Sequence, residues 1–304
     1  MKFWDDPAFN YARAITARHS KSFYISAGFL PKEKRWATYG LYGFCRYADN
    51  LIDNPRGRSP YDILEEIESL AREIEIAYRT GESEHPIVRV LITVAKRYGI
   101  PMQYPLELLA GVRMDLENKR YETFDDLYLF CYRVAAVVGL MMTHVMGYTD
   151  VRAFTYAEKL GVAMQLTNIL RDIKEDALMG RIYIPQAEIR RFRCHESDIA
   201  RGYMTNRFRE LMKFQADRAK TYYLEADYGI PMLTNNCQFA IRSASRIYRG
   251  ILAEIESRNF NPFLGRVHVS QRRKIGILFS EIIRGKLLPS SGRWLEIPET
   301  SFGK

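Results

Sequence analysis

Apolar residues recur every three to four positions along most of the chain, which is the spacing of one buried face of an α-helix. Alternation of apolar and polar residues with a period of two, which would indicate strands, is scarce. Short breakers that contain proline or glycine separate the periodic segments. The pattern therefore predicts an all-α protein with helices at about residues 7–18, 32–53, 60–79, 86–98, 104–118, 123–146, 151–178, 205–227, 233–257 and 270–286.

The predicted helices follow one another without a long linker. No Ser/Gly-rich or low-complexity tract divides the 304 residues, and a chain of this length can form one large domain. The composition, with 47% hydrophobic and 27% charged residues, is that of a globular protein with enough apolar material for a core. We therefore predict a single all-α domain over residues 1–304.

The sequence shows no targeting segment and no stretch that approaches the roughly 18 apolar residues of a membrane-spanning helix. The longest candidate, residues 134–142, is too short and is flanked by Arg133 and His144. Asp5 and Asp6 stand where a signal peptide would have its apolar region. These features predict a cytoplasmic protein.

The cysteines agree with that compartment. They lie far apart in the sequence and form no CxxC pair, so neither a disulfide nor a zinc site is expected. Three of the four lie in apolar segments and are expected in the core. The positions are Cys45, Cys131, Cys194 and Cys237.

The net charge of +9 fits three kinds of partner: a nucleic acid, an anionic membrane surface or a polyanionic small substrate. Residues 190–209 are basic with interleaved aromatic residues, but they contain no RNA-recognition motif, so we expect no nucleic-acid partner. Charge alone does not choose between the other two.

Two pairs of aspartates share the same spacing: Asp49 with Asp53, and Asp172 with Asp176. Residues four apart are neighbours on a helix, with roughly 5–6 Å between their Cβ atoms, and like charges at that distance repel. An isolated helix therefore gains nothing from either pair. A solvated acidic face would explain one such pair, but each pair also belongs to a longer polar stripe.

The polar stripes contain uncharged and basic side chains as well as the aspartates. Tyr42 and Arg46 precede the first pair on the same helical face, and Gln165 and Asn168 precede the second. The helix around the second pair is otherwise apolar, so its carboxylates need partners. Mg²⁺ prefers oxygen ligands and combines one or two carboxylates with water and substrate phosphates. We therefore predict that the pairs face each other and hold diphosphate groups through bridging Mg²⁺ ions, which Mn²⁺ could replace.

Several cationic and hydroxyl residues are suited to binding the same anions. Residues 19–23 place two serines beside a lysine, although a helix cap would use the same residues. Arg171 adjoins the second pair, and Arg181 and Tyr183 follow it. A later basic cluster could bind phosphate or could simply be solvated: Arg242, Arg246, Tyr248 and Arg249.

These motifs resemble the squalene/phytoene synthase family over roughly residues 10–285. The first signature is HSKSFY at residues 19–24 followed by YGFCRYADNLID at residues 42–53. The second is QLTNILRDIKED at residues 165–176, continued by GRIYIP at residues 180–185. Residues 132–139 match a third block, except that Ala136 stands where many relatives have glycine. Residues 22–53 and 180–185 look more like the bacterial phytoene synthases of that family than like its squalene synthases.

The resemblance implies an isoprenoid-synthase helical bundle around a central cavity. It also implies roles for individual residues. Expected metal ligands are Asp49, Asp53, Asn168, Asp172 and Asp176. Expected substrate contacts are Ser20, Ser22, Arg46, Gln165, Asn168 and Tyr248. Expected catalytic residues are the four aspartates with Tyr132, Arg171 and Tyr183.

The implied reaction joins two geranylgeranyl diphosphates head to head through a cyclopropylcarbinyl diphosphate, prephytoene diphosphate, to give phytoene for carotenoid biosynthesis. The same resemblance allows squalene or dehydrosqualene synthesis from two farnesyl diphosphates, and squalene synthesis would also require NADPH. Ala136 leaves the length of the prenyl chain open.

Two further interpretations remain. A head-to-tail prenyltransferase or terpene cyclase also uses helical aspartate clusters, but the residues flanking the aspartates argue against it. A scaffold protein derived from the family would be expected to lose the aspartates, and all four are present. The charge and the lipophilic product favour peripheral contact with the inner face of the membrane. The oligomeric state is left open.

Overall fold

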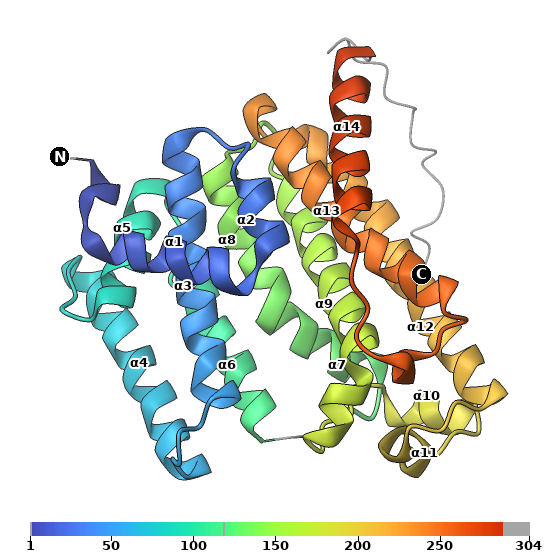
Figure 1. Cartoon of the computed structure of the whole chain (residues 1–304). Helices are drawn as coiled ribbons and strands as arrows, with labels where there is room; N and C mark the ends of the chain where they lie inside the picture. The colour runs from blue at the N-terminus through green and yellow to red at the C-terminus, as the bar shows by residue number, and fades with distance from the viewer. Residues whose placement is uncertain (1, 118, 288–304) are drawn as a thin grey trace, which may run out of the picture.

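The computed structural model describes residues 2–117 and 119–287, apart from the side chains of Ser22 and of residues 284–287. The described chain is helical and has no strand, only an isolated bridge between Tyr148 and Leu233. The predicted all-α class is therefore confirmed. The α-helices in Figure 1 are α1 (Pro7–His19), α2 (Lys21–Ala27), α3 (Lys32–Asp53), α4 (Pro60–Thr80), α5 (Pro86–Tyr98), α6 (Gln103–Leu116), α7 (Phe124–Cys131), α8 (Val137–Met146), α9 (Ala153–Leu178), α10 (Gln186–Arg191), α11 (Glu196–Arg201), α12 (Asn206–Ala226), α13 (Asn235–Ser257) and α14 (Gln271–Leu287).

Local sequence signals explain where these helices begin and end. The α4 helix starts with a capping box, in which Ser59 and Asp62 satisfy each other's backbone N–H groups. It ends at Gly81, whose φ of 87° places it in the left-handed region that glycine adopts without strain. The predicted helix bounds are confirmed to within about three residues wherever such signals and a long apolar period occur together.

The structure differs from the prediction in the short elements. The helices α2, α10 and α11 were not predicted, because six or seven residues are too few to show an apolar period. The predicted helix at residues 123–146 is not one regular helix, because a π-helical turn, η2 (Tyr132–Ala136), separates α7 from α8. A π turn contains one residue more than an α turn and therefore shifts the phase of the helix.

The helix from Phe124 to Met146 also corrects the expectation about apolar length. It has 23 residues and a mean hydropathy of 1.6 over its most apolar window, so by length and composition alone it could cross a membrane. More than half of that window, 56%, is buried inside the protein. Its contacts with α3, α6 and α9 account for its apolar character as that of a core helix.

The helices form a ring around a central space (Figure 1). On one side, α3 packs on α6 and α8, and α8 with the π turn packs on α9. On the other side, α3 packs on α2, α2 packs on α13, and α13 packs on α9. Direct contact between α3 and α9 is at most marginal in the described chain, so these two helices lie on opposite sides of the space.

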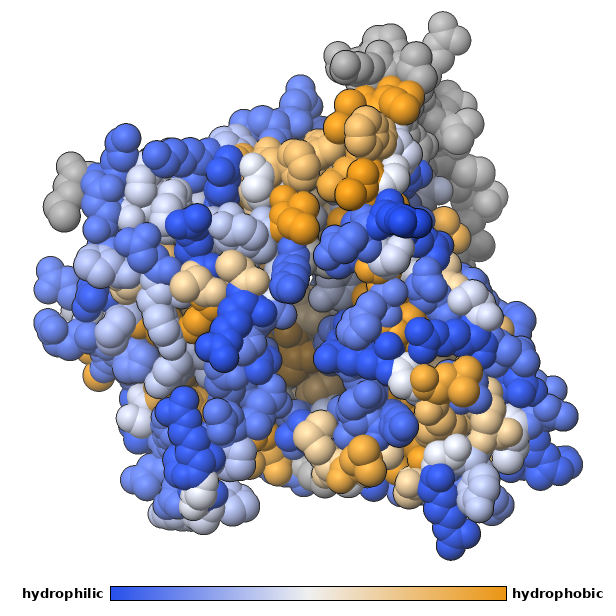
Figure 2. All heavy atoms as spheres, viewed as in Figure 1, coloured by the Kyte–Doolittle hydropathy of each residue, from blue (hydrophilic) through white to orange (hydrophobic). Residues whose placement is uncertain are grey.

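Two groups of buried apolar residues lie on either side of this space. One includes residues of α3, α4, α5 and α6, and the other includes residues of α9 and α12. The side chain of Tyr132, in the π turn, packs against both. Between them Figure 2 shows a cleft with polar residues along its walls and apolar residues in its depth. That arrangement separates a polar rim from an apolar interior.

The π turn lies very close to α9. A Cβ atom added to Gly161 of α9 would stand only 2.5 Å from the Cα atom of Ala136. Glycine is therefore required at residue 161, and the approach fixes the position of the π turn against α9. Ala136 itself is fully buried.

Candidate active site

The two aspartate pairs lie at the C-terminal ends of the helices on opposite sides of the cleft. Asp53 is the last residue of α3, and Asp176 lies two residues before the end of α9. The C-terminal end of a helix carries partial negative charge, which disfavours carboxylates there. This placement therefore weakens both helix ends, and it is explained if the carboxylates bind cations.

Arg181 and Asp115 lie between the two pairs. The Nη1 atom of Arg181 is 3.9 Å from Oδ1 of Asp53 and 3.4 Å from Oδ2 of Asp115. Asp176 also acts electrostatically on Arg181. One guanidinium thus lies near carboxylates of α3 and α6 and is influenced by one of α9. This arrangement brings the two aspartate pairs to one site.

Asp115 was not predicted as a site residue. Its Oδ1 atom accepts a hydrogen bond of 2.5 Å from the hydroxyl of Tyr183, and burial raises the pKa of its carboxyl. Asp115 lies on the same face of α6 as the buried Leu108 and Val112. A lone carboxylate that continues a buried apolar face is the signal by which it could have been found.

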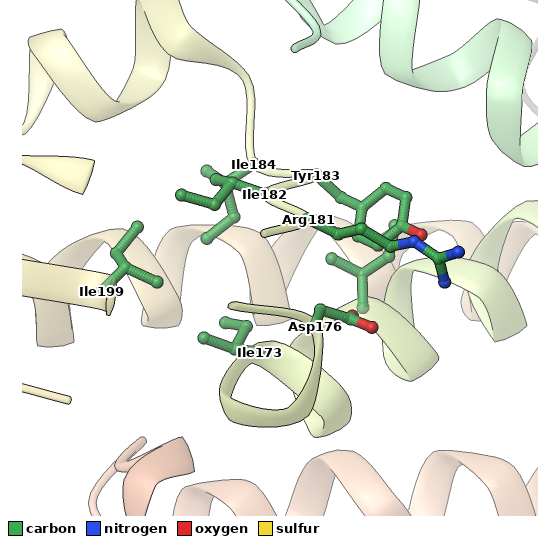
Figure 3. Close-up of a pocket in the computed structure, with 8 residues that line it drawn as sticks. Ile173, Asp176, Arg181, Ile182, Tyr183, Ile184 and Ile199 are labelled. Atoms are coloured by element: carbon green, nitrogen blue, oxygen red, sulfur yellow. The ribbon is translucent and has the colours of Figure 1, made fainter. Parts of the chain in front are cut away.

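The segment of residues 180–185, here called the strap, brings Arg181 and Tyr183 to the aspartates. Figure 3 shows the polar ends of Asp176, Arg181 and Tyr183 on the same side of the strap, away from Ile182 and Ile199. The backbone N–H of Arg181 donates to the carbonyl of Asp176 at 2.8 Å, which ties the strap to the end of α9.

A buried ion pair fixes the far end of the strap. Glu188 of α10 is 9% exposed and binds Arg218 of α12, whose Nη1 atom lies 3.0 Å from Oε2 of Glu188. The guanidinium of Arg218 also lies over the ring of Phe124, 3.8 Å from its centroid. Gln215 donates a further hydrogen bond to Glu188. The strap is therefore held at both ends.

One carboxyl in each pair has a strongly raised pKa. Burial raises the pKa of Asp49 to about 7, and the charge of Asp53 adds to the effect. Burial likewise raises the pKa of Asp176 to about 7, with Asp172 as the next cause. Arg46 and Arg181 oppose these shifts without cancelling them. Asp49 and Asp176 are therefore carboxylates that lack sufficient positive charge around them.

The other carboxyl in each pair is bound by arginine. Asp53 accepts a hydrogen bond of 3.2 Å from Arg46. Asp172 accepts two from Arg171, at 2.8 and 2.5 Å, and two from Arg266, at 2.8 and 3.1 Å. Burial alone would raise the pKa of Asp172, but the two guanidinium groups hold it below its usual value.

The donor atoms at the cleft fit a hard divalent cation. Within the described residues, no three histidine, cysteine, aspartate or glutamate side chains converge closely enough to hold an ion by themselves. Mg²⁺ does not need such a cage, because it keeps water and phosphate oxygens among its ligands. The buried Oδ1 of Asn168 has no hydrogen-bond partner in the described chain, and its amide nitrogen donates to Gln165 at 3.2 Å. This free oxygen and the undercompensated Asp49 and Asp176 are suited to bind such an ion.

Hydroxyl groups and cations lie above the first aspartate pair. Burial raises the pKa of Tyr42 to about 12, Tyr248 of α13 adds to the shift, and Ser20 hydrogen-bonds the Tyr42 hydroxyl. Burial would lower the pKa of Arg171, but Asp172 and then the same Tyr248 raise it. The predicted residues Ser20, Tyr248, Arg46 and Arg171 are thus brought to one region of the cleft. The side chain of Ser22 lies outside the described residues.

Lys21 and Lys274 form a cationic pair that the sequence did not predict. The pKa of Lys274 in α14 is lowered, first by burial and then by the charge of Lys21 in α2. Two ammonium groups that repel each other favour an anionic ligand.

Tyr132 lies in the π turn, where its side chain packs against both groups of buried apolar residues. Burial raises its pKa, and the carboxylates that add to the shift are Glu158 and Glu107, not any of the four aspartates. The ring of Phe130, two residues earlier, stacks on Tyr183 with centroids 5.2 Å apart. The catalytic role of Tyr132 stays a prediction.

The cysteines take no part in this site. All four thiols are free and buried. For Cys45 and Cys131 burial raises the pKa, which leaves them as neutral core residues. Each of the four therefore packs as a free thiol in the described chain.

Comparison with known proteins agrees with this geometry. The sequence model of the squalene/phytoene synthase family matches residues 16–273. The 15-cis-phytoene synthase of Synechococcus elongatus is 38% identical over 293 residues, which are 92% of this chain and 94% of that one.

The chain belongs to the squalene/phytoene synthase family. The chloroplastic phytoene synthase 1 of Arabidopsis thaliana is 34% identical over 94% of this chain and 68% of its own length. A crystal structure of a dehydrosqualene synthase with a bound ligand superposes with a TM-score of 0.86 at 31% identity, covering 94% of this chain and all of that one. The squalene synthase of Alicyclobacillus acidocaldarius gives a TM-score of 0.77 at 26% identity, covering 84% of this chain and 95% of that one.

Family membership settles several of the predictions. The isoprenoid-synthase helical bundle is confirmed, and the protein is a prenyltransferase rather than a scaffold. Its family acts on prenyl diphosphates and generally requires a divalent metal. The roles of the individual site residues stay predictions.

Proposed function

We propose that this prenyltransferase condenses two molecules of geranylgeranyl diphosphate head to head to give phytoene. The observation that carries the proposal is the pair of acidic helix ends on opposite sides of an apolar cleft, with Arg181 between them: its guanidinium pairs with Asp53 and Asp115, and its backbone N–H donates to the carbonyl of Asp176. The similarity to cyanobacterial phytoene synthases over nearly the whole chain supports C20 substrates.

The reaction needs two diphosphates to leave and two protons to be lost. In the first step the allylic C–O bond of one substrate breaks, the double bond of the other attacks the cation, and loss of a proton closes a cyclopropane. In the second step that product loses its own diphosphate, rearranges and releases a proton. Both steps create negative charge on a leaving diphosphate and positive charge on carbon.

The chain supplies groups suited to both charges. Arg46, Arg171 and Arg181 can bind the leaving diphosphates and offset their charge. The apolar interior of the cleft excludes water, which would otherwise capture the cation. The stacked rings of Phe130 and Tyr183 lie beside the aspartates, and aromatic faces stabilise cations.

Asp49, Asp53, Asp172, Asp176 and Asn168 are the residues that would hold Mg²⁺. The bound ion would neutralise charge on the diphosphate and so improve it as a leaving group. The raised pKa values of Asp49 and Asp176 support this assignment, because these carboxylates otherwise lie together without enough compensating charge.

A second candidate is dehydrosqualene or squalene synthesis from two farnesyl diphosphates. The close superposition on a dehydrosqualene synthase favours it. The deciding experiment incubates the purified enzyme with labelled C15 and C20 diphosphates, with Mg²⁺ and with or without NADPH. A C40 hydrocarbon formed without NADPH supports our proposal. A C30 hydrocarbon as the main product contradicts it, and squalene formed only with NADPH would identify a squalene synthase.

A further inference from the structure

One face of α14 is covered by α13, and the opposite face is apolar and exposed. The covered face packs antiparallel on α13: Glu281 is 1% exposed and pairs with Arg246, and Ser280 accepts a hydrogen bond of 3.1 Å from the same arginine. Ile277 lies over Gly250 on this face. These contacts fix the rotation of α14 about its axis.

The opposite face presents a stripe of large apolar side chains to solvent, here called the α14 stripe. Its members are Ile275, Phe279, Ile282 and Ile283, which are 54%, 61%, 41% and 54% exposed. Their spacing of three and four residues places them on one side of the helix. Figure 2 shows these apolar residues gathered at the upper end of the molecule. An apolar patch of this kind marks an interaction surface.

The charges around the stripe are positive. Residues 271–287 contain five basic residues and one acid, and that acid is the buried Glu281. Arg272 is exposed at the start of the helix, and Lys274 lies beside Lys21 of α2. The exposed Ile25 and Phe29 continue the apolar surface next to α13, where Phe29 contacts Phe239.

We propose that the α14 stripe docks the protein onto an anionic lipid bilayer. Apolar side chains that enter the boundary of the acyl chains, with cations at the level of the head groups, are the features of an interfacial helix. A second copy of this chain fits less well, because a two-fold contact would bring the same cations together. Anionic lipids would neutralise those cations.

The position of the stripe suits the transfer of lipophilic molecules between the bilayer and the cleft, an inference that rests on the proposed function. The α14 helix packs on α13, one of the helices around the cleft, and Figure 2 shows the apolar surface over α14 on the same face of the molecule as the cleft, above its rim in this view. Long prenyl chains and a hydrocarbon product partition into lipid. A bilayer held at this rim could deliver the chains and receive the product.

The test measures binding of the full chain to vesicles without any substrate. The wild-type protein should co-sediment with phosphatidylcholine vesicles that contain phosphatidylglycerol, less with phosphatidylcholine alone, and less at high salt. Phe279→Asp and Ile283→Asp should each weaken the partition at least tenfold. Leu224→Asp is the matched control, because Leu224 of α12 is also 61% exposed and gains the same charge. This control should bind like wild type.

Two further measurements make every outcome decisive. The activity of Phe279→Asp should equal that of wild type in detergent and should fall when the substrate is carried in vesicles. A wild-type protein that binds vesicles but forms no product would contradict the proposed function and leave the docking proposal standing. Wild-type protein that binds no vesicle, or Phe279→Asp that binds as well as wild type, overturns the docking proposal. A dimer in solution that Phe279→Asp converts to a monomer, without lipid binding, assigns the stripe to a second copy instead.

Discussion

The two acidic edges of the cleft, Asp49 with Asp53 on α3 and Asp172 with Asp176 on α9, share a sequence spacing but differ in their surroundings. On α3, Asp53 is 41% exposed and is bound by Arg46, while Asp49 is left with a pKa near 7. On α9, Asp172 is 19% exposed and bound by two arginines, while Asp176 is left with a pKa near 7. Each edge therefore has one carboxylate that is bound by arginine and one that lacks enough positive charge around it. The difference is that the arginine-bound carboxylate on α9 is more deeply buried and is held by two arginines, whereas the one on α3 accepts a hydrogen bond from one.

The largest expected effect concerns the undercompensated carboxylate on each edge. Asp49→Asn and Asp176→Asn should each lower kcat by about 10²–10³-fold, the usual loss when one preorganised electrostatic group is removed. Steady-state kinetics with saturating Mg²⁺ checks this, with the exposed Asp217→Asn as control. If one variant kept most of its activity, that edge would not hold the ion and the two edges would not be equivalent.

The second prediction compares what anchors each edge. Arg218→Met leaves the buried Glu188 unpaired and should lower the free energy of unfolding by about 3 kcal/mol. Arg58→Met should cost less than about 1 kcal/mol, because the Arg58–Glu66 pair after α3 is partly solvated. Urea unfolding measures both.

Adding Glu188→Gln to Arg218→Met should restore part of the lost stability, since the lone buried charge is removed. Equal losses for Arg218→Met and Arg58→Met would mean that the strap is not more tightly anchored than the turn after α3.

The third prediction uses pH in the absence of metal. The folded-state pKa values of Asp49 and Asp176 are raised to about 7, above the unfolded value near 4, so the folded state binds more protons between these limits. Their contribution to stability is therefore present at low pH and is lost as pH rises toward 7. With EDTA, Asp49→Asn should melt about 2 °C or more above wild type at pH 8 and should not differ at low pH. A lower melting temperature than wild type at pH 8 would contradict the raised pKa.

The smallest expected effect separates the two arginines on Asp172. Arg266 is 48% exposed, so Arg266→Gln should change the free energy of unfolding by less than about 1 kcal/mol. Arg171 is 15% exposed, and Arg171→Gln should cost more than Arg266→Gln in the same assay. A reversed order would show that the loop residue, not the helix residue, holds Asp172.

Long periodic helices and their caps were predictable from the sequence. The bounds of α3, α4 and α5 follow from an apolar period combined with proline or glycine at the ends. Short helices such as α2 and α10 were not predictable, because tertiary contacts rather than periodicity define them. The π turn was also not predictable, since its five residues fit the pattern of an ordinary helical segment.

For the site, the sequence predicted that the aspartates lie on polar helical stripes, but it did not predict Asp115 or the contacts of the strap that connect the two stripes. The i to i+4 spacing is a local property, so Asp172 and Asp176 could be found from one helix alone. Asp115 and the strap required knowledge of which helix ends meet, which is a long-range property. The role of Tyr132 was predicted from a motif and stays a prediction; the fold places its side chain against both groups of buried apolar residues.

The π turn at Tyr132–Ala136 has a consequence for how this helix can change. Its extra residue rotates the upstream helix by about 100° relative to a regular helix, while Gly161 allows the turn to pack closely against α9. Loss of one residue there would leave α8 in place and swing Phe130 off Tyr183. The length of that turn, more than the identity of its side chains, decides whether the ring of Phe130 stacks on Tyr183.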